Sequence, residues 1–99
     1  MKRFVIATDS APASLKNEIT GAIRARDWSF WHWFDELWIV VVPDPTASAK
    51  TIHDLIEALP SYDNHSIVIF STGAGRESYW GVSKAESWDW MQRHLGEAK

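Results

Sequence analysis

An aspartate stands directly after the first apolar segment of this 99-residue chain, at the end of the run Phe4–Asp9. Its carboxylate suits two kinds of chemistry. Two such groups, brought together by the two-fold axis of a homodimer, could share a hard divalent cation such as Mg²⁺ or Mn²⁺. Alternatively, Asp9 could accept hydrogen bonds from the first amides of a following helix. We favour this capping role, because aspartates between a strand and a helix commonly have it.

A second polar segment follows the last long apolar run. Ser71, Thr72, Gly73, Gly75 and Arg76 offer hydroxyls, backbone amides and a guanidinium, which together could hold a phosphate group. The segment lacks the lysine of a P-loop and the third glycine of a dinucleotide-binding loop. A connector between two elements is therefore the favoured interpretation.

The histidines do not form a metal-binding pattern. His32, His53, His65 and His94 include no pair spaced four residues apart, and the chain has no cysteine to complete a zinc site. His32 is the one histidine that lies between aromatic residues in an expected strand. It could be a general base, but we favour a packed structural side chain.

Four of the seven tryptophans fall within residues 27–42, which predict an aromatic β-hairpin turning at Asp35-Glu36. Exposed aromatic rings on a sheet could stack on the bases of single-stranded nucleic acid. Such platforms normally accompany basic grooves, and this chain has few basic residues near the hairpin. We therefore expect the tryptophans to form a buried protein interface, with the following members: Trp31, Trp33 and Trp38.

The remaining elements follow from the spacing of apolar residues. Strands are expected over residues 4–8 and 66–71 and in the two arms of the hairpin, and a helix is expected over residues 12–26. A second helix carries Ile52, Leu55, Ile56 and Leu59 at helical spacing. A third begins with a capping box of Ser83 and Glu86 and carries Trp88, Met91 and Leu95 on one stripe.

This order predicts a single α+β domain over residues 1–99, a ferredoxin-like split βαβ sandwich with an extra C-terminal helix. We expect the first and last strands to be central in the sheet. Two helices cover one sheet face only, and the central strands carry apolar residues on both faces. A second subunit or the third helix should therefore cover the other face.

Composition narrows the functional classes. The chain has 13 acidic and 10 basic residues, a net charge of −3, and no run of like charge, which disfavours a dedicated duplex-DNA binder. The absence of cysteine excludes disulfides and thiolate metal sites. No apolar stretch approaches the roughly 20 residues of a membrane span, and the first apolar run is too short for a signal peptide. We expect a cytoplasmic protein without a membrane partner.

Several segments carry a resemblance to known families. The run Phe4–Asp9, followed by a helix and an aromatic hairpin, resembles the small ferredoxin-like nucleases of CRISPR spacer acquisition and the relatives of virulence-associated protein D. Residues Trp31–Val40, Tyr79–Val82 and Ala85–Trp90 resemble small uncharacterised bacterial and phage proteins of the SinR family. In the nuclease family, strand-end aspartates of two subunits face each other and can hold a divalent cation. The resemblance assigns that catalytic and metal-binding position to Asp9.

Three functional hypotheses remain open. The favoured one is a non-enzymatic homodimer that interacts with a protein partner, in a mobile-element, phage or toxin–antitoxin setting. The second is a metal-dependent nuclease or endoribonuclease that uses paired Asp9 residues with Mg²⁺ or Mn²⁺. The third is a protein that binds single-stranded nucleic acid.

Overall fold

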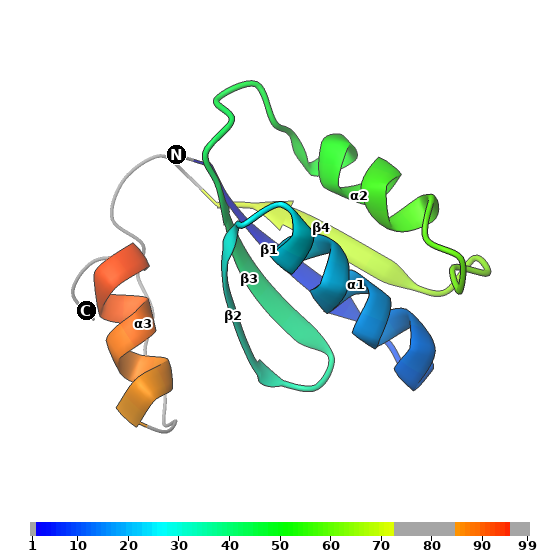
Figure 1. The fold of residues 1–99 in the computed structure, drawn as a ribbon, viewed down its shortest axis with the longest axis horizontal. Coiled ribbons are helices and arrows are strands. Elements are labelled where there is room, and N and C mark those ends of the chain that lie inside the picture. The colour runs from blue at the N-terminus through cyan, green and yellow to red at the C-terminus, as the bar shows by residue number, and fades with distance from the viewer. Residues whose placement is uncertain (1, 73–84, 96–99) are drawn as a thin grey trace.

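The computed structural model describes residues 2–72 and 85–95, which form one four-stranded antiparallel sheet and three helices (Figure 1). The elements are β1 (Lys2–Thr8), α1 (Ala13–Ala25), β2 (Ser29–Phe34), β3 (Leu37–Val42), α2 (Ala49–Glu57), β4 (Ile67–Ser71) and α3 (Ala85–Leu95). Figure 1 shows α1 and α2 lying across the same face of the sheet. The predicted ferredoxin-like βαββαβ fold with an additional C-terminal helix is confirmed.

The position of the last strand differs from the prediction. The strand order is β2-β3-β1-β4, so the central strands are β1 and β3, and β4 lies at an edge. The prediction that the first and last strands are both central is therefore wrong for β4. Each split βαβ unit leaves room for one strand of the other unit between its own two strands. The first strands of the two units become central, and the second strands become the edges.

Helix α1 packs on the sheet through residues spaced one helical turn apart. Leu15, Ile19 and Ile23 are almost completely buried and face β1 and β3. The helix ends at Ala25 with Arg26 as its C-cap, and Asp27 has a φ of 59°, a left-handed conformation that turns the chain into β2. The tertiary contacts of this apolar stripe fix α1 over the middle of the sheet.

Helix α2 begins at a cap that the apolar spacing did not reveal. The Ser48 hydroxyl accepts a hydrogen bond from the Thr51 amide at 3.2 Å, and the Thr51 hydroxyl accepts from the Ser48 amide at 3.1 Å. These two bonds form a capping box in which threonine replaces the usual glutamate. Ile52 and Ile56 then bury one side of the helix against the sheet.

The main core lies between the sheet and these two helices. Trp38 is fully buried there, its indole N–H donates to the Thr20 hydroxyl at 3.0 Å, and the His32 ring stacks on it with centroids 4.2 Å apart. The fully buried indole thus keeps a partner for its one polar atom. The buried members of this core are Phe4, Ile6, Ala11, Leu15, Ile19, Ile23, Trp38, Val40, Val42, Ala47, Ile52 and Ile56.

Helix α3 covers part of the opposite face. Trp31 and Ile39 pack against Leu95 of α3, and the Trp31 indole N–H donates to the Ser87 hydroxyl at 2.6 Å. The Arg3 guanidinium donates to the carbonyl of residue 94 at 2.8 Å. The structure therefore bears out the alternative in which the third helix covers this face over β2 and β3. Ser83 of the predicted capping box and the Trp88 side chain lie outside the described part of the chain.

A bulge in β2 moves one aromatic side chain to the other face of the hairpin. The pairing of β2 with β3 shifts register between Trp31 and Phe34. The Phe34 ring consequently meets the Trp31 ring edge-on, with centroids 5.0 Å apart. Simple alternation along the strand would have placed these two rings on opposite faces.

None of the helices in the described residues is long and apolar enough to span a membrane.

Replacement of either buried tryptophan should destabilise the chain strongly. We expect Trp38→Ala and Trp31→Ala each to lower the free energy of unfolding by about 3–5 kcal/mol, because a large cavity remains and a hydroxyl loses its indole partner. Trp33, which is 43% exposed, is the matched control, and Trp33→Ala should cost less than about 1 kcal/mol. Urea unfolding followed by circular dichroism measures all three values. Equal losses at positions 31 and 33 would contradict the docking of α3 on Trp31.

Candidate functional site

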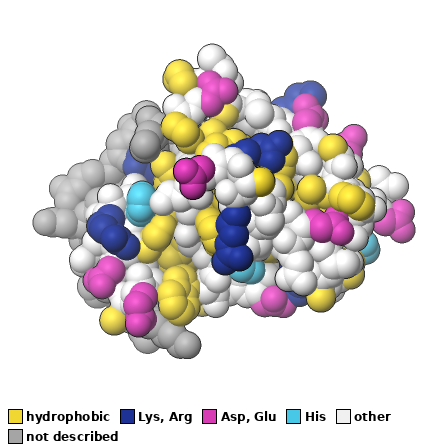
Figure 2. Space-filling model, in the orientation of Figure 1, with side chains coloured by type: hydrophobic (Ala, Val, Ile, Leu, Met, Phe, Trp, Pro, Cys, Tyr) yellow, Lys and Arg dark blue, Asp and Glu magenta, His cyan; other side chains and the backbone are white. Residues whose placement is uncertain are grey.

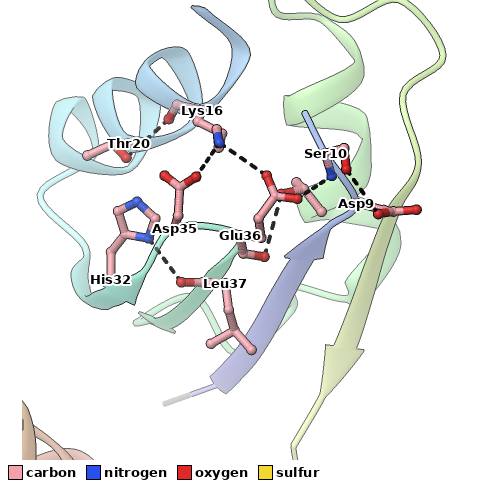
Figure 3. Close-up of polar contacts among 9 residues, drawn as sticks. Asp9, Ser10, Lys16, Thr20, His32, Asp35, Glu36 and Leu37 are labelled. Atoms are coloured by element: carbon pink, nitrogen blue, oxygen red, sulfur yellow. Dashed lines mark hydrogen bonds and ion pairs between the residues drawn. The ribbon is translucent and has the colours of Figure 1, made fainter. Parts of the chain in front are cut away.

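Polar side chains from three segments meet at the end of the sheet where β1 finishes (Figure 3). Lys16 of α1 lies 2.5 Å from Asp35 and 3.2 Å from Glu36, both in the β2–β3 turn. The other Glu36 carboxylate oxygen accepts a hydrogen bond from the Ser10 amide. The Thr8 amide donates to the Glu36 carbonyl at 2.9 Å. This cluster ties the hairpin turn to the connection between β1 and α1.

Charges in the cluster shift each other's protonation equilibria. The hydrogen bond to Asp35 raises the pKa of the Lys16 ammonium, and Glu36 adds to this effect against the opposing influence of burial. Burial opposes ionisation of Glu36, but hydrogen bonds from Lys16 and from the Ser10 amide outweigh it and lower the pKa of the carboxyl. Both groups are therefore held in their charged forms near neutral pH.

Asp9 does not cap α1, so the favoured capping prediction is wrong. The helix starts after Pro12, and no side chain caps its first amides. Ser10 has a φ of 56°, and this left-handed residue together with Ala11 turns the chain away from Asp9 before the helix begins. The Asp9 side chain is exposed and accepts a weak hydrogen bond from the Ser10 hydroxyl at 3.4 Å. Glu36 instead bonds the connection that Asp9 was expected to stabilise.

Within residues 2–72 and 85–95, no group of three or more histidine, aspartate or glutamate side chains is placed to hold a metal ion. Asp9 therefore contributes a single exposed carboxylate to any cation site. A second carboxylate would have to come from another copy of the chain.

The three tryptophans predicted to form an interface have different environments. Trp38 and Trp31 are 0% and 2% exposed within one chain, so in this arrangement neither can touch a partner. Trp33 is 43% exposed to solvent, and the neighbouring Phe34 is 55% exposed. Of the hairpin aromatics, Trp33 and Phe34 at its tip therefore offer the most surface to another molecule.

The described part of the segment predicted to bind phosphate is engaged with β1. The Thr72 amide and hydroxyl both donate to the Arg3 carbonyl, at 2.9 and 3.2 Å, and Ser71 is exposed at the end of β4. These bonds continue the sheet by one residue. Gly73, Gly75 and Arg76 lie outside the described residues, so the structure does not test a phosphate site there.

Two histidines have clear structural environments. The Nδ1 atom of His32 lies 2.9 Å from the Leu37 carbonyl, which can only accept, so this nitrogen carries the proton. His94 lies 3.3 Å from the Ser29 hydroxyl, and burial, followed by the charges of Arg93 and Arg3, lowers the pKa of its ring. His32 is thus a packed side chain that stacks on Trp38, as the favoured structural interpretation predicts.

A different feature, the outer edge of β4, has no partner strand among residues 2–72 and 85–95. The Thr72 amide bonds to Arg3 and the Asp9 amide bonds to the Ser66 carbonyl, at 2.9 and 3.2 Å. Antiparallel ladders alternate, so every second residue from 66 to 72 directs its backbone groups toward β1. No described strand pairs with the other side of β4. The residues whose backbone N–H and C=O groups point to this open edge are Ile67, Ile69 and Ser71.

Apolar side chains border this edge. Ile67 and Ile69 pack toward the main core, so the alternating Val68 and Phe70 side chains lie on the opposite face, where they are 52% and 58% exposed. Beside the edge, α2 and β4 form an open groove of about 320 Å³. It is lined by Ala49, Lys50, His53, Ile67, Val68 and Ile69.

The two edges of the sheet differ in their protection. Edge strand β2 is irregular, because its register shifts between Trp31 and Phe34, and such bulges discourage pairing with another strand. Edge strand β4 is regular over its five residues and contains no charge, proline or bulge. The expected central position of this strand would have paired both of its sides, whereas the observed edge position leaves one side without a described partner strand.

Comparisons with known proteins give no assignment, since no protein-family model, curated protein or solved structure matches the chain. The fold and surfaces of the chain itself therefore carry the functional proposal.

The acidic cluster at the hairpin turn predicts a specific pH dependence of stability. Because the pKa of Glu36 is below its ordinary 4.5 in the folded chain, its stabilising contribution is fully present above that value and is lost as the pH falls through the folded pKa. Glu36→Gln should therefore reduce stability at pH 7 and weaken the acid dependence below pH 4.5. Denaturant unfolding between pH 3 and 7 measures this, with Asp63→Asn, at an exposed position before β4, as the control. An unchanged acid dependence in Glu36→Gln would contradict the role of this carboxylate.

Proposed function

We propose that the chain is a non-enzymatic interaction protein that acts as a homodimer and binds another polypeptide strand at the β4 edge. The observation that supports this proposal is the unprotected edge itself. At this edge, the backbone donors and acceptors of Ile67, Ile69 and Ser71 have no strand partner in the described part of the chain, and the Val68 and Phe70 side chains are exposed. Proteins generally protect such edges, and an unprotected one is a template for strand addition.

The energetics of this edge favour a protein ligand. An added strand would provide backbone hydrogen-bond partners and would remove the Phe70 and Val68 side chains from water. Cross-strand contacts between aromatic and β-branched residues contribute roughly 0.2–1 kcal/mol per pair, in addition to the burial of apolar area.

The basic residues near the hairpin support a protein ligand over a nucleic acid. The Arg24 guanidinium lies 5.5 Å from the centroid of the Phe30 ring, and that of Arg26 lies 5.8 Å from the Trp28 ring. These cations lie over two half-buried rings and leave less of their faces available for stacking with bases. Figure 2 shows basic and acidic side chains interspersed over the helix-bearing face, without a broad basic surface. Backbone phosphates would find little concentrated positive charge there.

A charge placed on the open edge should prevent self-association. Sedimentation of the native chain at tens of micromolar is expected to give twice the monomer mass. Phe70→Lys should give the monomer mass, because pairing the strands would remove the lysine ammonium groups from water at a cost in free energy. Phe34→Lys is the matched control, since Phe34 is similarly exposed but belongs to the bulged edge strand. A native chain that sediments as a monomer would refute the proposed function.

The exposed Asp9 carboxylate keeps a metal-dependent nuclease as a second candidate. Because Asp9 does not cap α1, its oxygens are available to a cation, and a two-fold axis near the end of β1 would supply the second carboxylate. Mg²⁺ or Mn²⁺ would then polarise a phosphate and lower the pKa of a bound water.

Calorimetric titration with Mn²⁺ tests this second candidate. The nuclease hypothesis requires one ion per two chains in the native protein and none in Asp9→Asn, which keeps the size of the side chain but loses its charge. Asp63→Asn, in the exposed turn before β4, is the control and should bind like the native chain. If the homodimer has no shared metal, the native chain and Asp9→Asn will give the same heat of dilution.

A further inference from the structure

We infer that the strand added at this edge is β4 of a second copy, in antiparallel pairing centred on Ile69. This inference rests on the proposed function and specifies its partner and geometry. A two-fold axis perpendicular to the sheet pairs a strand with itself in the antiparallel direction, and it makes the same patch of both copies self-complementary. The product is one continuous sheet of eight strands with the order β2-β3-β1-β4-β4-β1-β3-β2.

The alternation of backbone groups fixes the allowed registers. Ile67, Ile69 and Ser71 direct their N–H and C=O groups outward, so these residues must form the hydrogen-bonded pairs of the new ladder. Centring on Ile69 pairs Ile69 with itself and Ile67 with Ser71 in both directions. A shift by two residues in either direction would leave one end of the five-residue strand without a partner. The centred register therefore uses all the open backbone groups.

The same register matches the side chains. Val68 of one copy falls opposite Phe70 of the other, twice, in the pairs that lack mutual hydrogen bonds and bring side chains closest together. Both side chains are more than half exposed in the single chain. Their pairing would cover the apolar residues of β4 on the face that α3 leaves open.

The charged side chains of α2 beside the new ladder are already paired within one chain. Lys50, which lines the groove beside β4, forms an ion pair with Asp54 of the same helix at 2.7 Å, and His53 lies 3.5 Å from Glu57. The two-fold axis sets the two α2 helices antiparallel to each other, and each basic side chain keeps its acidic partner within its own copy.

This pairing excludes the shared metal site. Asp9 bonds to Ser66, three residues from the axis at Ile69 and one strand further from the interface. With a rise of about 3.4 Å per residue and about 4.8 Å between strands, the two Asp9 Cα atoms lie about 25 Å apart. No ion can bridge that distance. A β4-paired dimer and a nuclease with paired Asp9 residues are therefore alternative assemblies of this chain.

Single cysteines test the register, because the native chain has none. Val68→Cys and Phe70→Cys chains are mixed, allowed to exchange, and oxidised mildly. The centred register brings the two Cα atoms to about 4.5 Å, and a band of twice the monomer mass should appear on a non-reducing gel. In either variant alone the like cysteines lie about 8 Å apart, beyond the roughly 7 Å that a disulfide spans, so the band should be lost. Phe34→Cys mixed with Phe70→Cys is the control for random collision and should give no band.

Each other outcome overturns the inference in a distinct way. A band from Val68→Cys alone, or from Phe70→Cys alone, would show a register shifted by two residues. Dimers in sedimentation without any cysteine-linked band would place the interface elsewhere and leave homodimerisation intact. Monomers in sedimentation would remove the proposed function itself.

Discussion

The constraint on which this structure depends is that the central strands β1 and β3 are apolar on both faces. Phe4 and Ile6 of β1 face α1 and α2, while Val5 and the β3 residue Ile39 face the other way. Two layers of helices are therefore needed, and the chain has one full layer and one partial layer. The α3 helix covers the β2–β3 half of the second face, and the β4 side retains exposed apolar residues.

The sequence predicted the fold well because local patterns determine it. The spacing of Leu15, Ile19 and Ile23 predicted α1, and the interruption of the aromatic run at Asp35-Glu36 predicted the hairpin turn. These signals are short-range and depend on side-chain periodicity alone. The prediction that β4 is central failed for a different reason. Strand order depends on how the two βαβ units interleave, which no local pattern records.

The candidate site was much harder to predict, because its contacts join residues that are distant in the chain. Glu36 bonds to Ser10, and Trp31 bonds to Ser87, across separations of 26 and 56 residues. No spacing rule marks such partners. Asp9 looked like a cap because of its position before α1, but the left-handed Ser10 changes the direction of the chain. The hairpin aromatics looked like an interface, but Trp38 and Trp31 complete two separate cores.

The central position of β1 also sets the order in which the chain can fold. β1 precedes both of its neighbours in the chain, β3 and β4, and Ile67–Ser71 completes the sheet. Until β4 has left the ribosome, β1 is itself an edge strand, and its pairing with β4 closes a loop of about 60 residues at a cost that grows slowly with length. Such non-local pairing slows folding. Before β4 pairs, the unpaired edge of the sheet lies at β1, and once β4 has paired, the edge moves outward to β4.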